Sequence, residues 1–356
     1  MPKIAIVGTT SFGITLGVVL ARNGVAVSLW ARTKQEAIEL AETGHNPVPA
    51  DSACFPPELT ITCSLSEALS RANAVILAVP SQSMRQNMKL VAGHIGKSTL
   101  IVSAAKGLEI ESGKRMSQVI AEEIKPGLSS NICVLSGPNL APEIMNSLPA
   151  ATVAAAEDEA IAKKVQKLLT TPNLCVFTNT DVIGVELGGS LKNIIALGAG
   201  IADGLGYGDN AKAALMTRGL TEMTALGVAL GADPLTFSGL TGLGDLIATC
   251  SSSLSRNHYC GSELAKGRPL KEITDSMTGV VEGVSTTLAV WKIARQMGLE
   301  MPITETIYRV LYEGADLHQA ANNLMTAGAA HELAGKKWRL FSNLRVRRRS
   351  KPSLAA

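Results

Sequence analysis

The segment GTTSFG at 8–13 has the spacing of a loop that binds the phosphates of a dinucleotide. In the fingerprint G-x-G-x-x-G, the first glycine makes a tight turn, the second admits the pyrophosphate and the third lets the helix meet the strand. Gly8 and Gly13 occupy the first and third places, but Thr10 occupies the second, where a side chain would crowd the pyrophosphate. The loop predicts cofactor binding at the positive end of a helix, with an ordinary strand-to-helix turn as the alternative.

The residues after Trp30 bear on the choice between NAD and NADP. An acidic residue about 20 positions beyond the glycine loop would bind the ribose hydroxyls of NAD, but none appears before Glu36. Arg32 stands there instead, and a guanidinium accommodates the 2′-phosphate of NADP. We therefore expect NADP or NAD as cofactor, with NADP favoured. A solvated loop arginine is the alternative interpretation.

Four further segments place polar side chains among glycines instead of on a regular helix face. They are 103–109, 136–139, 184–193 and 242–257. The first two directly follow predicted strands, and ligands of open α/β sheets bind outside the carboxyl ends of the strands. Glycine in such loops allows the backbone to approach a ligand closely. We expect the first two loops to line the cleft of a ligand site.

The elements that must position these loops alternate between strand and helix up to about residue 180. Short apolar runs that predict buried strands lie at 3–7, 25–30, 74–79, 99–103, 132–135 and 151–154. A helix is expected over about 12–23, with Gly24 placed to end it. This alternation predicts a Rossmann-like α/β domain with a doubly wound parallel sheet.

Beyond residue 180 the sequence becomes rich in Ala, Leu, Gly and Met, and its apolar residues recur at helical spacing. This pattern predicts an all-α domain. We therefore expect an NAD(P)-binding domain over 1–180 and a helical substrate and catalytic domain over 181–335. The remainder, 336–356, is basic and lacks acidic residues. We expect it to be a disordered tail, with a contact to an anionic surface as the alternative.

Composition excludes several classes of protein. A chain with 46% hydrophobic and 18% charged residues is not intrinsically disordered, and 3% aromatic residues argue against a protein that stacks single-stranded nucleic acid. Six cysteines without a C-x-x-C pair indicate neither a metal site nor a disulfide framework. The uncharged stretch 4–21 contains a polar, glycine-bearing break, so it predicts a strand, a loop and a helix instead of a membrane span. We expect a cytoplasmic protein with no metal, nucleic acid or transmembrane segment.

Four longer motifs together resemble the NAD(P)-dependent glycerol-3-phosphate dehydrogenase family of bacteria and organelles. They are AAKGLE at 104–109, DVIGVELGGSLKN at 181–193, TGLGDLIATCSSSLSRN at 241–257 and VVEGVSTT at 280–287. The resemblance extends from the first strand to about Thr326. It implies reversible reduction of dihydroxyacetone phosphate to sn-glycerol 3-phosphate, which feeds glycerophospholipid synthesis. It also implies a homodimer and a helical domain similar to that of 6-phosphogluconate dehydrogenase.

The same resemblance assigns catalytic roles to three residues. Lys192 is the implied proton acceptor and donor, Lys106 polarises the substrate oxygen, and Asp245 orients a lysine ammonium. A lysine can serve as a base when burial and a neighbouring cation lower its pKa, and Lys106 would be that cation for Lys192. By residue type alone, a surface lysine is the less favoured alternative for Lys192, and Asp245 could also cap the following helix.

The remaining site residues also follow from the resemblance. Arg256 and Asn257 are expected to hold the substrate phosphate, because guanidinium and amide groups donate to phosphate oxygens. The expected substrate contacts are Lys106, Gly137, Asn139, Lys192, Asp245, Thr249, Ser255, Arg256 and Asn257. The expected cofactor contacts are Gly8, Thr10, Ser11, Phe12, Gly13, Arg32, Lys106, Ala141, Arg256, Val281 and Glu282.

Two other functions fit parts of the pattern. A related 3-hydroxyacid dehydrogenase has the same two-domain plan, but the Arg256-Asn257 pair suits a phosphate better than a carboxylate. A non-catalytic nucleotide-sensing protein would keep the fold while Thr10 disturbs the cofactor loop. The simultaneous presence of Lys106, Lys192 and Asp245 speaks against that second alternative.

Overall fold

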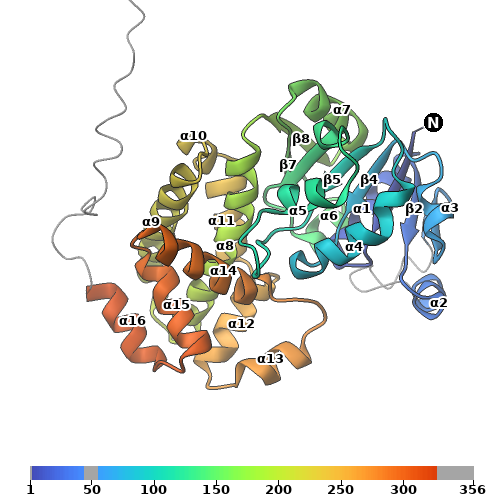
Figure 1. Ribbon diagram of the computed structural model, residues 1–356. Coiled ribbons are helices and arrows are strands. Elements are labelled where there is room, and N and C mark those ends of the chain that lie inside the picture. Colours follow the sequence, from blue (N-terminus) through green and yellow to red (C-terminus); the bar gives the residue numbers. More distant parts are fainter. Residues whose placement is uncertain (1, 44–54, 327–356) are drawn as a thin grey trace, which may run out of the picture.

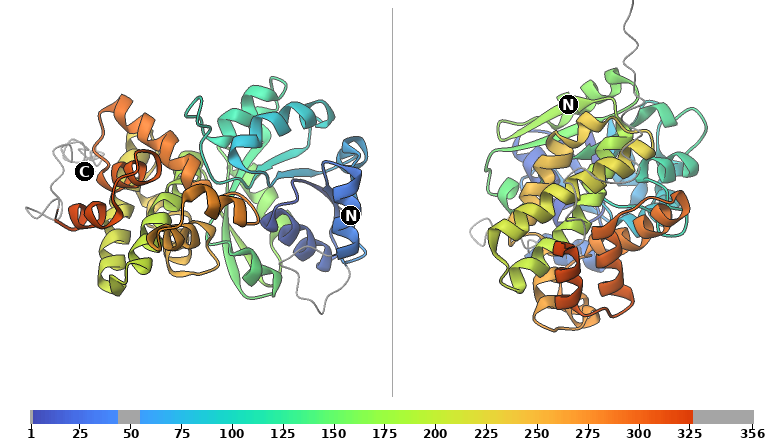
Figure 2. Two further views of the ribbon diagram at one scale, coloured as in Figure 1. Left: turned by 90° about the horizontal axis from the view of Figure 1, so that it is seen from below. Right: turned by 90° about the vertical axis from the view of Figure 1, so that its left-hand side faces the viewer.

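The computed structural model describes residues 2–43 and 55–326 (Figure 1). The expected basic tail at 336–356 lies outside these residues. An eight-stranded sheet and a group of helices lie side by side, as the two further views in Figure 2 also show. The expected fold class, a Rossmann-like sheet domain followed by an all-α part, is confirmed.

The sheet has the strand order β3-β2-β1-β4-β5-β6-β7-β8. Its strands are β1 (Lys3–Val7), β2 (Ala26–Trp30), β3 (Leu59–Thr62), β4 (Ala74–Leu77), β5 (Leu100–Ser103), β6 (Ile132–Ser136), β7 (Ala150–Ala155) and β8 (Leu174–Asn179). The six predicted strands are confirmed with end shifts of one or two residues, whereas β3 and the edge strand β8 were not predicted. Both faces of the sheet are covered by helices, which is why its central strands are continuous apolar runs.

One pair of strands corrects the expectation of a wholly parallel sheet. β6 and β7 run antiparallel, while every other neighbouring pair in the sheet is parallel. The connection between them contains only the short helix α6 (Ala141–Met145), which does not carry the chain back across the sheet. β7 therefore starts at the edge where β6 ends, and the loop with Gly137 and Asn139 stays at that edge.

Seven helices belong to the sheet domain. Besides α6, they are α1 (Ser11–Arg22), α2 (Lys34–Thr43), α3 (Leu65–Leu69), α4 (Met84–Val91), α5 (Met116–Glu123) and α7 (Glu159–Leu169). In β1, Ile4 and Ile6 pack in the core with α1, α6 and α7, whereas Ala5 and Val7 pack in the core with α3, α4 and α5. This alternation follows from the two-residue period of a strand.

The helical part begins with α8 (Val182–Gly204) and continues, up to the last described residue 326, with eight further α-helices. They are α9 (Gly208–Ala229), α10 (Pro234–Phe237), α11 (Asp245–Ser251), α12 (Arg256–Ala265), α13 (Leu270–Ser276), α14 (Glu282–Met297), α15 (Pro302–Tyr312) and α16 (Leu317–Thr326). α8 is the central helix and also contacts β6 and β7. Among the described residues it alone is long and apolar enough to cross a membrane, yet 89% of the relevant window is buried inside the protein.

Close backbone contact holds α8 against α12. A Cβ atom on Gly200 would lie 1.9 Å from the carbonyl oxygen of His258, and one on Gly261 would lie 2.1 Å from the carbonyl oxygen of Leu197. Only glycine fits at such positions. The two helices therefore approach more closely than larger residues would allow, and this fixes the start of α12 relative to α8.

Candidate active site

A buried carboxylate joins the two lysines of the predicted site. Asp245, the first residue of α11, is 1% exposed. Its Oδ1 accepts a hydrogen bond from Lys192 Nζ at 2.7 Å, and its Oδ2 accepts one from Lys106 Nζ at 2.7 Å. Lys192 comes from the middle of α8, whereas Lys106 comes from the loop after β5. The carboxylate of Asp245 pairs with lysines and does not cap α11.

Thr249 holds the Lys192 ammonium from one turn further along α11. Its Oγ1 accepts a hydrogen bond from Lys192 Nζ at 2.5 Å and donates one to the carbonyl oxygen of Asp245 at 2.6 Å. Lys192 is only 7% exposed, so its charge would be costly to bury without these partners. Asp245 and Thr249 together fix the Nζ atom of Lys192 in one place.

The Lys106 ammonium has a lowered pKa. Burial lowers the pKa of Lys106 to about 8, the adjacent Asp245 carboxylate opposes that change, and the nearby Lys192 ammonium adds to it. Two ammonium groups share one carboxylate, so the fully ionised group carries a net positive charge. Such a group stabilises negative charge that develops on a substrate oxygen.

The loop after β6 supplies a polar wall beside Lys106. Lys106 Nζ donates a second hydrogen bond to the carbonyl oxygen of Gly137 at 2.7 Å. Asn139 Nδ2 donates to Thr152 Oγ1 at 3.0 Å, while its buried Oδ1 has no partner among the described residues. A buried acceptor without a partner is costly unless a ligand donates to it. Asn139 thus presents an acceptor that suits a substrate hydroxyl.

The start of α12 places Arg256 differently from its two neighbours. Arg256 is exposed and forms no hydrogen bond or ion pair with residues 2–43 or 55–326. Asn257 Nδ2 donates to Asn193 Oδ1 at 2.9 Å, and its Oδ1 accepts from the Gly283 N–H at 2.8 Å. Ser255 caps the helix, because its Oγ accepts from the His258 N–H at 3.2 Å. Of the three expected phosphate contacts, Arg256 alone keeps all its donors available.

The glycine loop keeps the shape of a phosphate cradle despite Thr10. Gly8 has a φ of +111°, and a Cβ atom there would lie 2.4 Å from the carbonyl oxygen of Ala78. Thr10 is the N-cap of α1; its Oγ1 accepts from the Gly13 N–H at 3.2 Å and donates to the Ala78 carbonyl at 2.8 Å. The hydroxyl of Thr10 therefore points toward the protein backbone.

Two helix-terminal N–H groups remain open beside this loop. Ser11 and Phe12 are the first two residues of α1, and their N–H groups have no partner within the described part of the chain. A helix N-terminus of this kind attracts phosphate. The residues of the loop thus fit the pyrophosphate of a dinucleotide cofactor.

Glu36 lies beside the glycine loop and is not among the site residues predicted from the sequence. Its carboxylate accepts a hydrogen bond from the hydroxyl of Thr9 in the glycine loop and one from the Arg32 N–H at 2.8 Å. The Arg32 guanidinium is exposed and donates to Asn87 Oδ1 at 3.4 Å. The missed signal was the pattern T-x-x-E, since Thr33 Oγ1 accepts from the Glu36 N–H at 3.1 Å and turns Glu36 back toward the loop.

Glu282 connects the helical part to the sheet domain. It is the first residue of α14, preceded by Val281, and its carboxylate accepts from the Ser81 N–H at 2.9 Å and from Ser81 Oγ at 2.5 Å. Ser81 follows β4 after a short loop, so this contact joins the two parts near the carboxyl edge of the sheet. Ala141, the first residue of α6, offers only its backbone and a methyl group.

Comparisons with known proteins agree with this geometry. The family model described as the N-terminus of NAD-dependent glycerol-3-phosphate dehydrogenase matches residues 3–162, and the model described as its C-terminus matches residues 181–322. A protein of Dehalococcoides mccartyi named glycerol-3-phosphate dehydrogenase [NAD(P)+] is 62% identical over 99% of this chain and 98% of its own length. A protein of the same name from Chlorobium limicola is 46% identical over 91% of this chain and 97% of its own length.

Solved structures lead to the same group of proteins. The crystal structure of glycerol-3-phosphate dehydrogenase from Coxiella burnetii superposes with a TM-score of 0.86 at 36% identity, covering 91% of this chain and 99% of that one. A ketopantoate reductase from Ralstonia eutropha superposes with a TM-score of 0.58 at 16% identity over 91% of this chain and 99% of that one, which shows a shared fold alone.

Proposed function

This chain belongs to the NAD-dependent glycerol-3-phosphate dehydrogenase family, and we propose that it catalyses the reversible reduction of dihydroxyacetone phosphate to sn-glycerol 3-phosphate. NAD or NADP, when bound in the glycine loop, supplies or accepts the hydride. The observation that carries the proposal is the pairing of Lys106 and Lys192 with the buried Asp245, because a carbonyl reduction needs both a proton donor and a stabilised oxygen.

The two lysines take different parts in the proton chemistry. Lys192 donates a proton to the substrate oxygen as hydride reaches C2, and in the oxidation it takes the proton of the C2 hydroxyl. Lys106 donates a hydrogen bond to the same oxygen and stabilises its developing negative charge. Asp245 and Thr249 orient Lys192, since each lies within hydrogen-bonding distance of its Nζ. These assignments rest on the geometry and on the family resemblance.

Arg256 binds the substrate phosphate in this proposal. Its guanidinium has the charge of Glu282 nearby but forms no hydrogen bond among the described residues, and it can form two parallel hydrogen bonds to phosphate oxygens. Asn257 and Ser255 support it, because their side chains hold the start of α12 against α8 and α14. Asn139 accepts a hydrogen bond from a substrate hydroxyl through its free Oδ1.

The start of α1 would hold the pyrophosphate of the cofactor, and Lys106 and Glu282 are the residues that would contact its nicotinamide. Gly8 and Gly13 allow the loop its tight turn, since a Cβ atom on either would lie 2.4 Å from a backbone oxygen. At the ribose end, Arg32 suits the 2′-phosphate of NADP and Glu36 suits the ribose hydroxyls of NAD. We therefore propose use of both cofactors. In this division residues 1–180 bind the cofactor, and 181–335 provide the substrate site and the catalytic base.

A homodimer in the cytoplasm is the form we propose for this enzyme. Five large apolar side chains are exposed in the stretch 235–259: Leu235, Leu243, Ile247, Leu254 and Tyr259. Exposed large apolar side chains on one segment of the chain support a subunit interface there. The five described cysteines, Cys63, Cys133, Cys175, Cys250 and Cys260, are unpaired, which is typical of a reducing compartment. Light scattering with size-exclusion chromatography tests the dimer.

The activity is tested by following the absorbance of NADPH, and separately of NADH, at 340 nm with dihydroxyacetone phosphate as acceptor. Turnover supports the proposed reaction, and the ratio of the two rates measures the cofactor preference. Faster oxidation of glycerate or 3-hydroxyisobutyrate than of glycerol 3-phosphate would contradict the substrate assignment. Absence of binding to either nucleotide at millimolar concentration would contradict enzymatic function.

A further inference from the structure

Lys106 precedes a small hairpin that has few internal contacts. In the loop between β5 and α5, Leu108 and Arg115 form an isolated antiparallel bridge. The Glu109 N–H donates to the Lys114 carbonyl at 3.0 Å, and the Gly113 N–H donates to the Glu109 carbonyl at 2.8 Å. A two-stranded hairpin alone is only marginally stable in water. Contacts from outside the hairpin must therefore fix its place, and with it the place of the Lys106 ammonium.

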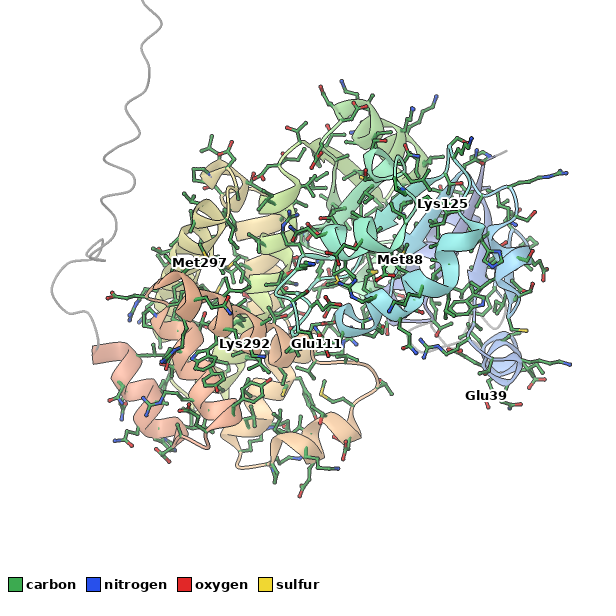
Figure 3. All side chains as sticks on the ribbon, viewed as in Figure 1. Glu39, Met88, Glu111, Lys125, Lys292 and Met297 are labelled. Atoms are coloured by element: carbon green, nitrogen blue, oxygen red, sulfur yellow. The ribbon has the colours of Figure 1, made fainter. Side chains whose placement is uncertain are left out.

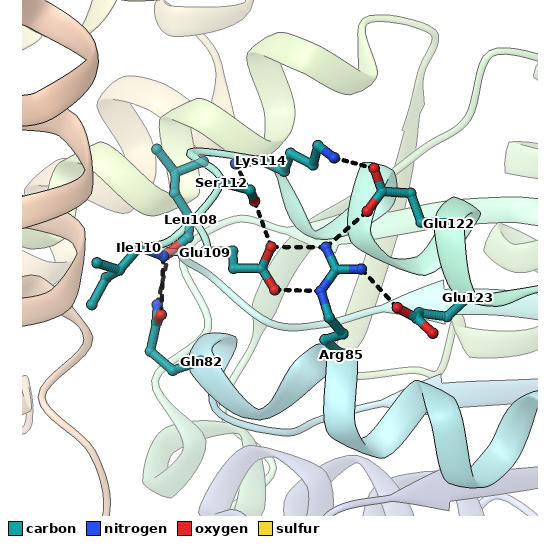
Figure 4. Close-up of polar contacts among 9 residues, drawn as sticks. All are labelled: Gln82, Arg85, Leu108, Glu109, Ile110, Ser112, Lys114, Glu122 and Glu123. Atoms are coloured by element: carbon teal, nitrogen blue, oxygen red, sulfur yellow. Dashed lines mark hydrogen bonds and ion pairs between the residues drawn. The ribbon is translucent and has the colours of Figure 1, made fainter.

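Gln82 supplies the first of these contacts. It lies just before α4 and faces the hairpin (Figure 4). Its Nε2 donates to the Leu108 carbonyl at 2.7 Å, and its Oε1 accepts from the Ile110 N–H at 3.1 Å. One side-chain amide thus pairs with the backbone on both sides of Glu109, as a neighbouring strand would. Leu108 is two residues from Lys106, so this pairing limits the movement of the lysine backbone.

Arg85 supplies the second contact through the side chain of Glu109. Arg85 Nε lies 2.7 Å from Glu109 Oε1, and Arg85 Nη2 lies 2.8 Å from Glu109 Oε2 (Figure 4). Such a two-point pair fixes direction as well as distance. The same guanidinium contacts Glu122 and Glu123 of α5 at 2.8 and 2.7 Å. Arg85 therefore ties the hairpin to both α4 and α5.

The opposite side of the hairpin is held less completely. Its last residue, Arg115, pairs with Glu186 of α8, whose carboxylate also accepts from the Ser117 N–H at 2.7 Å. Between the hairpin and α14 lies a cavity of about 230 Å³, lined in part by Glu111 and Lys292, both labelled in Figure 3. Leu108 is buried in the core of the helical part and Ile110 packs against that core, so apolar contacts hold this side of the hairpin while its turn borders the cavity. The contacts on the sheet side add the directional polar bonds that apolar packing does not provide.

We propose that Gln82, Arg85 and Glu109 act as positioning residues, forming a clamp that holds the Lys106 ammonium at the reacting oxygen of the substrate. The inference rests on the proposed role of Lys106. None of the three residues touches Lys106 Nζ, which instead contacts Asp245 and Gly137 and lies near Lys192. The clamp acts through the backbone at 106–110.

The charge state of the clamp does not change near neutral pH. Hydrogen bonds from Arg85 lower the pKa of Glu109, with further lowering by Ser112 and by the charge of Lys114, while burial opposes them. The same ion pairs raise the pKa of Arg85. Both partners are therefore ionised throughout the working range of the enzyme, and the clamp provides fixed geometry instead of a pH switch.

Glu109→Gln tests the clamp, with Glu122→Gln as the matched control. Each variant removes one carboxylate charge from Arg85, but Glu122 belongs to α5 and contacts the hairpin only through its exposed ion pair with Lys114. We expect Glu109→Gln to lower kcat/KM for dihydroxyacetone phosphate by about 10- to 100-fold, because a misplacement of about 1 Å has effects of this size. For Glu122→Gln we expect a change within about twofold, since exposed ion pairs contribute little. NADPH affinity, measured by fluorescence, should be unchanged in both.

The pH profile separates positioning from a general loss of structure. Loosening the hairpin exposes the Lys106 ammonium to water, which returns its pKa of about 8 toward the ordinary lysine value. The alkaline limb of kcat/KM should therefore move to higher pH in Glu109→Gln and in Gln82→Leu, and stay in place in Glu122→Gln. Both shifted variants should keep the wild-type circular dichroism spectrum.

Two further variants make the outcome decisive. Lys106→Met is measured in parallel: if it retains turnover, the proposed role of Lys106 fails, whereas loss in Lys106→Met with none in Glu109→Gln overturns the clamp alone. Adding Arg85→Met to Glu109→Gln should cause little further loss, because the pair acts as a unit. Equal losses in Glu109→Gln and Glu122→Gln, with an unmoved pH limb, would show a purely structural role and overturn the proposal.

Discussion

The two ends of the candidate site are built in different ways. The lysine centre joins residues far apart in the chain, since Lys106 and Asp245 are 139 positions apart and Lys192 and Asp245 are 53 apart. The nucleotide end combines local and distant contacts: Thr10 bonds Gly13 three positions on and Arg32 bonds Glu36 four positions on, while Thr10 also bonds the Ala78 carbonyl 68 positions away. The first is buried and the second is partly exposed.

This difference has consequences for substitution. In the lysine centre each charge depends on a partner that only the assembled fold provides, so removal of one group leaves another buried charge unpaired. At the nucleotide end water can replace a lost contact, so the effect of a change should be smaller. We therefore expect large losses of turnover in the first region and modest shifts of cofactor preference in the second.

The largest effect is expected for Lys192→Met. Removal of the proton donor should lower kcat by about 10²- to 10⁴-fold, which is the usual contribution of general acid–base catalysis. The affinity for NADPH should stay within about twofold, because the proposed role lies in the chemical step. Stopped-flow and steady-state rates measure the first quantity, and nucleotide fluorescence measures the second. Lys292→Met, on the surface of α14, is the matched control. A variant above a tenth of the wild-type rate would refute the assignment of Lys192.

Asp245→Asn should have the next largest effect. It should lower the stability of the protein and shift the pH dependence of its activity. Two ammonium groups lose their shared carboxylate, and breaking a buried pair costs about 3–5 kcal/mol in the free energy of unfolding. The charge of Asp245 raises the pKa of Lys106, so its removal should bring that pKa below about 8. Activity requires protonated Lys106 and is lost as pH rises through this pKa. The alkaline limb of kcat/KM should thus move to lower pH, the opposite direction from Glu109→Gln.

Arg256→Ala should act on substrate binding instead of on the chemical step. Hydrogen bonds from a charged group to phosphate contribute about 1.5–3 kcal/mol, so KM for dihydroxyacetone phosphate should rise about 10- to 100-fold. Asn257→Ala serves as comparison, because its side chain ties α12 to α8 and α14. That variant should lose thermal stability, which Arg256→Ala should keep. An unchanged KM in Arg256→Ala would remove the arginine from the phosphate site.

Sequence reasoning identified most of the fold because buried strands are continuous apolar runs. It missed β3, which has four residues, and β8, whose side chains alternate between buried and exposed. The orientation of β7 was wrong, since it depends on the path of the connection after Ser136 and not on the composition of the strand. Local patterns therefore predict that an element exists, but not how it pairs.

For the site, the sequence motifs identified the charged residues, but they did not show which of these residues form pairs. The family resemblance brought Lys106, Lys192 and Asp245 to one place, and no local pattern did so. The polar contacts of Asn257 inside the protein could not be anticipated, because Asn193 and Gly283 are distant in the chain. The role of Arg85 could not be anticipated either, because its partner Glu109 is distant in the chain. The position of Glu36 could have been anticipated, because Thr33 and Glu36 have the spacing of a capping box.

A smaller effect is expected from changes at the ribose end. Arg32→Ser should lower the preference for NADPH over NADH by about 10-fold, because a charged contact to the 2′-phosphate is lost in an exposed place. Glu36→Gln should shift the preference in the opposite direction, since its carboxylate repels that phosphate and accepts from ribose hydroxyls. The ratio of kcat/KM for the two nucleotides measures both. If both variants shift this ratio in the same direction, the two residues stabilise the loop and do not discriminate between the riboses of NAD and NADP.

The smallest effect is expected for Thr10→Gly, which restores the glycine fingerprint. The Thr10 hydroxyl faces Ala78 and the Gly13 N–H, so its removal opens little space at the phosphates. Replacing an N-cap by glycine costs only a few tenths of a kcal/mol, and NADPH affinity should stay within about threefold. Thr10→Ser keeps the hydroxyl and isolates the methyl group. If Thr10→Gly instead bound NADPH more than tenfold tighter, the side chain would obstruct the pyrophosphate. The nucleotide end would then be as sensitive to one side chain as the lysine centre, and the contrast between the two regions would fail.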